Sequence, residues 1–287
     1  MNEQILFSPP TDRMREAAER ELDGLSGVSG FTLGNSILGR PIRGWRIGHG
    51  RSEILYVATH HALESVCASI LYAFIDRLAA DDSPYAKTLR AAFTLTVIPC
   101  LNPDGVALRY GEALDNPLHS RQMRMSGGSF ARWQANARGV DLNHNYSQGF
   151  YEYKRIEAER GIVPGPTLYS GEYPESEPET MALASLVRVL SPSLVLSLHT
   201  QGEEIFYYPE EPRCRRLADR ASALCGYSVS AAEGTACYGG LCDYTGAMGI
   251  PSLTVEVGRG KNPLPDDSAK GLFCRIHPLL RLLPSLL

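Results

Sequence analysis

The sequence lacks the features that mark secreted, disulfide-stabilised or membrane proteins. Its seven cysteines are scattered without a Cys-x-x-Cys pair, which argues against a disulfide framework and a cysteine-based zinc site. No positively charged start precedes an apolar core at the N-terminus, and the apolar tail "HPLLRLLPSLL" is short and interrupted by Arg281 and Pro284. We therefore expect a cytoplasmic protein whose tail packs on the core as a helix.

The sequence also has no strong excess of one charge. Lys and Arg total 28 and Asp and Glu total 32, which gives a formal net charge of −4, and the two signs are well mixed. Without a basic stripe, neither nucleic acid nor an anionic membrane is an expected partner, and nothing predicts an oligomeric state. No linker, repeat or low-complexity tract divides the 287 residues, so we predict one domain over residues 1–287.

The apolar pattern predicts strands that alternate with helices. The predicted strands are 54–59, 93–99, 193–199 and 251–258, with a hairpin over 31–48, and the predicted helices are 11–25, 64–80, 176–190 and 268–287. Thr11 is a candidate capping residue, and Ser176 with Glu179 can form a capping box. Residues 100–175 show little regular structure, and such long loops are usually functional. The alternation predicts a mixed, largely parallel sheet with helices on both faces.

Chemically capable side chains follow four of the predicted strands. In chain order they are His61 with Glu64, then the "NPDG" of residues 102–105, then His199, Thr200 and Gln201, and finally Glu256. In open α/β sheets, ligands bind beyond the carboxyl ends of the strands. Four such strand ends in one chain therefore predict a single site.

The residue types at these strand ends are those of a catalytic zinc site. Two imidazoles and one carboxylate with an open fourth position bind catalytic zinc, so we predict that His61, Glu64 and His199 hold one zinc ion. His60 is an alternative ligand, although the spacing to Glu64 favours His61. Zinc lowers the pKa of a bound water and polarises a carbonyl, and a separate carboxylate then moves the proton to the leaving amine. Glu256 fits that role, because an ionised glutamate on a covered sheet face is costly without a task or a partner.

Six short motifs occur in a fixed order along the chain. They are His61-x-x-Glu64, "NPDG", "RWQANARGVDLNHNY", "SEPE", "SLHTQGEE" and "LTVEVG". In this order they resemble the zinc metallocarboxypeptidases of the carboxypeptidase A type, over nearly the whole chain from residue 38 to residue 258. The resemblance implies a three-layer α/β/α fold around a mixed sheet of about eight strands. It also implies the same three zinc ligands, and Glu256 as general base and then general acid.

The resemblance further assigns roles in substrate binding. Bacterial members of the family carry the oxyanion-stabilising arginine where this chain has Arg138, although Arg124 or Arg132 could supply that contact instead. Asn143 matches the asparagine that holds the terminal carboxylate of the substrate. The segment "GGLCDYTGAMGIP" aligns with the specificity pocket, which implies that Cys242 and Asp243 lie near the incoming side chain.

One position departs from the family pattern. The family usually reads Asp-x-Asn-Arg-Asn, whereas "DLNHN" has His144 in place of the clamp arginine. A histidine is mostly neutral near pH 7 and lacks the two-pronged donor, which weakens the case for strict recognition of an α-carboxylate. His144 and the "HTQGEE" segment resemble the branch that cleaves γ-D-glutamyl–diamino acid bonds in murein peptides. We therefore predict a murein-derived peptide as substrate, with Asn143, His144 and Gln201 in contact with it, although His144 and Gln201 could each simply hydrogen-bond a loop.

Three other functions compete with this prediction. The chain could be an ordinary carboxypeptidase for α-linked peptides, or a zinc deacylase of N-acyl amino acids. The related deacylases share His-x-x-Glu and a later histidine but do not usually show "NPDG" followed by "GVDLN". A non-catalytic relative would be expected to lose a ligand or the base, and this chain retains His61, Glu64, His199 and Glu256.

Overall fold

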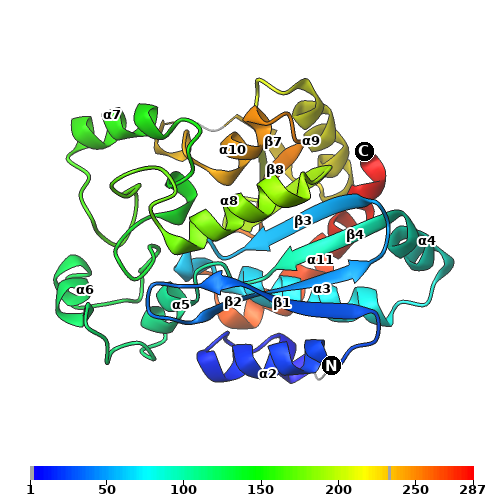
Figure 1. The fold of residues 1–287 in the computed structure, drawn as a ribbon, viewed down its shortest axis with the longest axis horizontal. Helices are drawn as coiled ribbons and strands as arrows, with labels where there is room; N and C mark the ends of the chain where they lie inside the picture. The colour runs from blue at the N-terminus through cyan, green and yellow to red at the C-terminus, as the bar shows by residue number, and fades with distance from the viewer. Residues whose placement is uncertain (1–2, 232–233) are drawn as a thin grey trace.

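A mixed sheet runs through the protein, whose residues 3–231 and 234–287 are described by a computed structural model (Figure 1). Within these residues eight strands form one sheet in the order β1-β2-β4-β3-β5-β8-β6-β7. The strands are β1 Val28–Asn35, β2 Pro41–Gly48, β3 Ser52–Ala58, β4 Phe93–Ile98, β5 Leu194–His199, β6 Glu204–Tyr207, β7 Ser228–Ser230 and β8 Ser252–Glu256. The central neighbours β4, β3, β5 and β8 pair in parallel. The predicted mixed sheet is confirmed.

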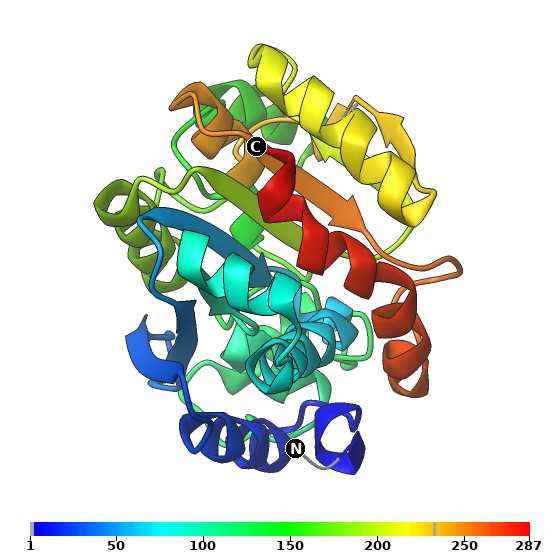
Figure 2. The ribbon, with the colours of Figure 1, turned by 90° about the vertical axis from the view of Figure 1, so that its right-hand side faces the viewer.

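Helices cover both faces of the sheet. The α-helices are α1 Glu3–Leu6, α2 Asp12–Asp23, α3 Val66–Ala80, α4 Pro84–Ala92, α5 Pro103–Arg109, α6 His119–Met125, α7 Phe150–Arg160, α8 Pro178–Leu190, α9 Pro212–Cys225, α10 Leu241–Ala247 and α11 Ala269–Leu282. α3, α9 and α11 lie on the face turned toward the viewer in Figure 2, and α8 crosses the opposite face in Figure 1. This arrangement gives the predicted three layers. None of these described helices is long and apolar enough to cross a membrane.

The central strands read as continuous apolar runs because both of their faces are buried. In β5 every residue from Leu194 to His199 is buried. Leu196 packs into the cluster under α3 and α11, whereas its neighbour Val195 packs into the cluster under α8. Strands covered on both faces lose the apolar–polar alternation of half-exposed strands, and the sequence shows this as "SLVLSL". The buried central strands hold the loops at their ends in fixed positions.

The structure confirms one of the two predicted helix caps and contradicts the other. The Thr11 hydroxyl accepts a hydrogen bond from the Met14 N–H and begins α2, as predicted. The capping box predicted for Ser176 and Glu179 is absent, because α8 is preceded by Glu177 and has no side-chain cap. The Ser176 hydroxyl instead bonds Glu177, and the Glu179 carboxylate accepts the N–H of Ile37. Tertiary contacts therefore take both side chains away from the helix end.

Two stretches hold more regular structure than the sequence predicts. The segment 100–175 contains α5, α6 and α7, so the expectation of little regular structure there was wrong in part. Between β5 and β8 the structure adds β6, α9, β7 and α10, which the apolar pattern did not predict. β6 and β7 have 4 and 3 residues. Strands this short give too few apolar–polar alternations to be read from sequence.

Candidate active site

Three neighbouring strands bring the predicted residues to one edge of the sheet. β3, β5 and β8 are adjacent and parallel, so their carboxyl ends meet at the same edge. His199 and Glu256 are the last residues of β5 and β8 and pair directly in register. His61 follows β3 and begins a short 3₁₀ helix, Ala62–Glu64, which turns Glu64 back toward it. Residues far apart in sequence thus become neighbours.

The side chains of His61, Glu64 and His199 form a compact cluster of metal-binding atoms. One ligand atom from each lies within 4.8 Å of the others. The two Nδ1 atoms of the imidazoles are 3.2 Å apart, and the Glu64 oxygens lie 3.0 Å from His61 Nδ1 and 3.0 Å from His199 Nδ1. Glu64 Oε2 is buried and accepts no hydrogen bond of good geometry among the described residues. Two imidazoles and an orphaned carboxylate oxygen that face one point fit a zinc ion.

Asp141 holds His61 from the side opposite this cluster. Its Oδ1 lies 3.0 Å from His61 Nε2, and the carboxylate also accepts hydrogen bonds from Gln134 Nε2 and the Leu168 N–H. Burial opposes ionisation of Asp141, but the nearby charge and hydrogen bond of His61 outweigh it and hold the pKa of the carboxyl well below its usual value. When a metal takes up Nδ1 of His61, the ring keeps one hydrogen on Nε2, where the Asp141 carboxylate can accept it.

A second support fixes His199. The Ser197 hydroxyl lies 3.0 Å from His199 Nε2, so this ring too is oriented through the nitrogen away from the cluster.

Burial and the charges of neighbouring histidines lower the pKa of His60 well below its usual value. His60 hydrogen-bonds the Tyr146 hydroxyl at 2.9 Å and stacks on His199, and it lies outside the three-residue cluster. His60 therefore packs beside the ligands.

The cluster opens into a cavity of about 250 Å³, which we call the catalytic cavity. Its wall contains the predicted site residues His61, Asn143, His144, His199 and Glu256. It also contains Cys242 and Asp243, which the resemblance places near the incoming side chain, together with Gln134 and Thr254. Thr254 and Glu256 line the cavity while Leu253 and Val255 pack in the core, as the alternation along β8 predicts. Burial raises the pKa of Glu256 well above its usual value, and the negative charge of Glu64 adds to the rise. A partly buried carboxylate beside the metal-binding side chains can accept a proton and return it.

The family model for zinc carboxypeptidases matches residues 25–254. The chain belongs to the zinc carboxypeptidase family. Its fold is similar to that of thrombin-activatable fibrinolysis inhibitor, with a TM-score of 0.79 and 16% identity over 99% of this chain and 75% of the other. A similarity at this identity concerns the fold alone.

Two relatives of the chain carry names that state an activity. Gamma-D-glutamyl-L-diamino acid endopeptidase 1 of Lysinibacillus sphaericus is 33% identical over 258 residues, which cover 83% of this chain. The chain spans only 62% of the length of that enzyme. Murein peptide amidase A of Escherichia coli strain K12 is 27% identical over 227 residues, which cover 71% of this chain and 79% of the amidase.

Arg138 does not reach the catalytic cavity of this zinc carboxypeptidase. Its Nε lies 3.0 Å from Glu177 Oε2, and the half-exposed side chain lines a separate cavity of about 110 Å³. Arg124 and Arg132 are exposed and do not line the described wall of the catalytic cavity either. Gln134, which follows Arg132 closely in the chain, does line the cavity with His61 and has one amide hydrogen bonded to Asp141. The sequence reasoning missed Gln134, because its role depends on which way the loop faces.

The three predicted substrate-binding residues fall into two groups. Asn143 and His144 both line the catalytic cavity. Gln201 is not among the described residues of its wall, and its Oε1 accepts a hydrogen bond from the Gly260 N–H at 3.2 Å. Gln201 thus supports the loop after β8, which is the simpler of the two roles considered for it.

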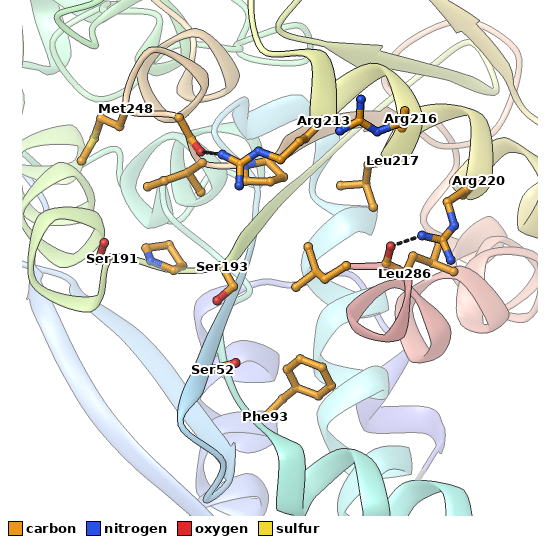
Figure 3. Close-up of a pocket in the computed structure, with 15 residues that line it drawn as sticks. Ser52, Phe93, Ser191, Ser193, Arg213, Arg216, Leu217, Arg220, Met248 and Leu286 are labelled. Carbon is orange, nitrogen blue, oxygen red and sulfur yellow. Dashed lines mark hydrogen bonds between the residues drawn. The ribbon is translucent and has the colours of Figure 1, made fainter.

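A larger cavity of about 730 Å³ lies at the opposite edge of the sheet (Figure 3). Ser52, Ser193 and Pro251 line it at the amino ends of β3, β5 and β8, and α9 adds three arginines, Arg213, Arg216 and Arg220. The described wall of this arginine-lined cavity contains no His, Cys, Asp or Glu side chain. It therefore offers no metal ligand and no general base, and the smaller cavity is the candidate active site.

Proposed function

We propose that this zinc carboxypeptidase hydrolyses the bond between a γ-D-glutamyl residue and a diamino acid in murein-derived peptides. The observation that carries the catalytic part is the position of Glu256, which pairs with the ligand His199 at the strand ends and shares one cavity with the metal cluster. The substrate part is supported by the two murein-related relatives. A cytoplasmic location, with recycled murein peptides as the source of substrate, stays a prediction.

Each group in the cavity has a distinct part in the proposed reaction. A zinc ion held by His61, Glu64 and His199 would supply a Lewis acid that acidifies water and polarises the scissile carbonyl. Glu256 accepts the proton of the attacking water and donates it to the leaving nitrogen, and its raised pKa suits the second of these transfers. Because Glu256 carries out both transfers, no other acid is needed to protonate the leaving nitrogen.

Gln134 is the side-chain donor best supported for the developing negative charge on the carbonyl oxygen. A glutamine amide carries two hydrogens, and Asp141 accepts only one of those on Gln134. The other is available in the cavity wall, whereas Arg138 is paired with Glu177 in a different cavity. Donors aimed at an oxyanion contribute strongly in sites that exclude water. We therefore assign this role to Gln134 in place of Arg138.

A paired substrate assay with a base-deficient variant tests the proposed function. Zinc-loaded protein is incubated with L-Ala-γ-D-Glu-meso-diaminopimelate and, separately, with an α-linked peptide, and products are followed by mass spectrometry. Glu256→Gln should lower kcat by roughly 10²–10⁴-fold while metal analysis finds zinc still bound. Cleavage of the α-linked peptide alone would refute the murein substrate and leave the zinc mechanism intact. A Glu256→Gln protein with near-normal turnover would remove Glu256 from its role.

A further inference from the structure

The described wall of the catalytic cavity contains no lysine or arginine. Its ionisable side chains are the imidazoles of His61, His144 and His199 and the carboxylates of Asp243 and Glu256. Three of these five belong to the metal cluster or to the proposed proton transfer. His144 and Asp243 remain without a role in the chemistry, although both are in the wall. They are therefore candidates for recognition of the leaving residue.

The hydrogen bond of His144 shows which ring nitrogen carries the hydrogen. Nδ1 lies 2.8 Å from the carbonyl oxygen of Tyr238, and a carbonyl can only accept, so Nδ1–H donates. Burial lowers the pKa of His144, which favours the neutral ring with a lone pair on Nε2. The ring is stacked on Tyr153 with centroids 3.8 Å apart and an interplanar angle of 9°, which fixes its orientation. Nε2 has no hydrogen bond among the described residues, so His144 offers an acceptor.

Asp243 adds a carboxylate to the same wall. It lies in the first turn of α10, and its Oδ2 accepts the Gly240 N–H at 3.1 Å. No lysine or arginine forms an ion pair with it among the described residues. Burial raises the pKa of Asp243 to about 6, so the group is mostly ionised at neutral pH. A partly buried carboxylate without a cation costs free energy, and a cationic ligand would offset that cost.

Asn143 supplies a neutral donor in the same wall. Its Oδ1 accepts the Leu241 N–H at 3.2 Å, which leaves its Nδ2 hydrogens for a ligand. A neutral amide donates to a peptide carbonyl and to a carboxylate with comparable geometry, whereas an arginine favours the charged carboxylate. Asn143 therefore does not require a free carboxylate on the leaving residue.

We propose that the catalytic cavity recognises the leaving residue through a cationic amino group held by Asp243 and His144, and does not depend on a free α-carboxylate. The substrate class is then peptides with a diamino acid after the scissile bond, whether that residue is terminal or is followed by further residues. This inference rests on the proposed function and deepens it. It predicts cleavage inside peptides as well as at their ends.

Two matched substrate pairs test the inference. γ-D-Glu-L-Lys and γ-D-Glu-L-norleucine differ by one amino group in place of a hydrogen on the last side-chain carbon, and each is prepared as the free acid and as the C-terminal amide. Wild type should prefer the lysine substrate by about 10-fold or more in kcat/KM, which is the range of a hydrogen-bonded charged pair. The free acid and the amide should differ by less than about 3-fold, because a neutral donor serves both.

Asp243→Asn isolates the charge in this test. Asparagine keeps an acceptor for the Gly240 N–H and so preserves the start of α10, but it removes the negative charge. The variant should lose the preference for lysine, so that its lysine-to-norleucine ratio in kcat/KM falls toward one. Asp219→Asn is the control, because Asp219 is exposed on α9 and pairs with Arg215. Binding of free lysine and free norleucine, measured by calorimetry, gives a second readout that does not need turnover.

The outcomes separate this inference from the proposed function. The same pairs are made with an α-linked L-glutamyl residue, and cleavage of these alone refutes the γ-linked substrate while the lysine preference can still be read. A wild-type lysine-to-norleucine ratio near one, unchanged in Asp243→Asn, overturns the inference whichever linkage is cleaved. Failure to cleave the amides overturns the statement about the carboxylate.

Discussion

The two cavities at opposite edges of the sheet differ in what their charges do. In the smaller catalytic cavity, His199 and Glu256 come from the carboxyl ends of the paired strands β5 and β8, and His61 follows β3. In the larger arginine-lined cavity, Arg213 and Arg220 reach across to the backbone carbonyls of Gly249 and Leu286, as Figure 3 shows. These arginines tie chain segments together at an exposed surface. The comparison teaches that buried charge on strand ends marks the active site better than cavity volume does.

Removal of a metal ligand from the catalytic cavity should have the largest effect on zinc binding and activity. His199→Ala should abolish stoichiometric zinc binding and lower kcat/KM by more than ~10³-fold, since loss of a single oxyanion donor already costs ~10²–10³-fold in other enzymes. Metal analysis and turnover of the γ-linked substrate measure the two effects. His49→Ala is the control, because His49 is exposed and outside the cluster. Retention of one zinc per chain in His199→Ala would contradict the assigned ligand set.

Removal of the Asp141 charge, which orients His61, should lower zinc affinity by a smaller amount. Asp141→Asn keeps the shape of the side chain but removes the charge that fixes the hydrogen on His61 Nε2. Loss of such a partner typically costs 10–100-fold in metal affinity, so zinc affinity should fall by about that factor. Competition with a chromophoric chelator measures it, and excess zinc should restore part of the activity. Unchanged affinity would mean that Asp141 only orders the loop.

The change of substrate preference with pH should be a smaller effect than the loss of zinc affinity in Asp141→Asn. The Asp243 carboxylate is charged above its pKa of about 6, so the preference for lysine over norleucine should rise from pH 5 to pH 7 and be lost as pH falls. Of the groups that interact with Asp243, Tyr208 and Cys242 have raised pKa values and stay neutral over this range, and Glu210 raises the pKa of Asp243. Titration of Glu256 affects both substrates, so their ratio cancels it. A ratio that is flat in wild type and in Asp243→Asn would count against the assignment.

Changes in the arginine-lined cavity should have the smallest effect. Arg216 is exposed on α9, and Arg216→Ala should leave kcat/KM within about twofold and the free energy of unfolding within ±0.5 kcal/mol, as for most surface substitutions. Steady-state kinetics and urea denaturation measure both quantities. A tenfold loss of activity would show that the two edges of the sheet are coupled and would break the comparison.

The sequence predicts correctly that His61, Glu64 and His199 lie together. Strand ends and the His-x-x-Glu spacing are readable in the chain, and parallel pairing of β3 with β5 then brings His61 and His199 together. The direction of a long side chain in a loop is not readable in this way. Arg138 turns toward Glu177, which is 39 residues away, and nothing in the local sequence records that attraction.

The short elements of the fold escape prediction for a related reason. β6 pairs with β8 and places Glu204 opposite Glu256, yet its 4 residues carry no pattern long enough to detect. For Asp243, the apolar pattern of "LCDYTG" does not predict burial, and only the family resemblance placed it near the substrate. Tertiary packing decides both cases.

The order of the central strands also determines when the metal centre can form during folding. His61 and His199 are 138 residues apart in the chain, and Glu256 joins them only when β8 docks on β5. Contacts between such distant parts of a chain form slowly, because each closes a long loop before it brings any stabilisation. Capture of zinc by the complete set of ligands should therefore be among the last events of refolding. Zinc binding would then report that the native sheet is complete.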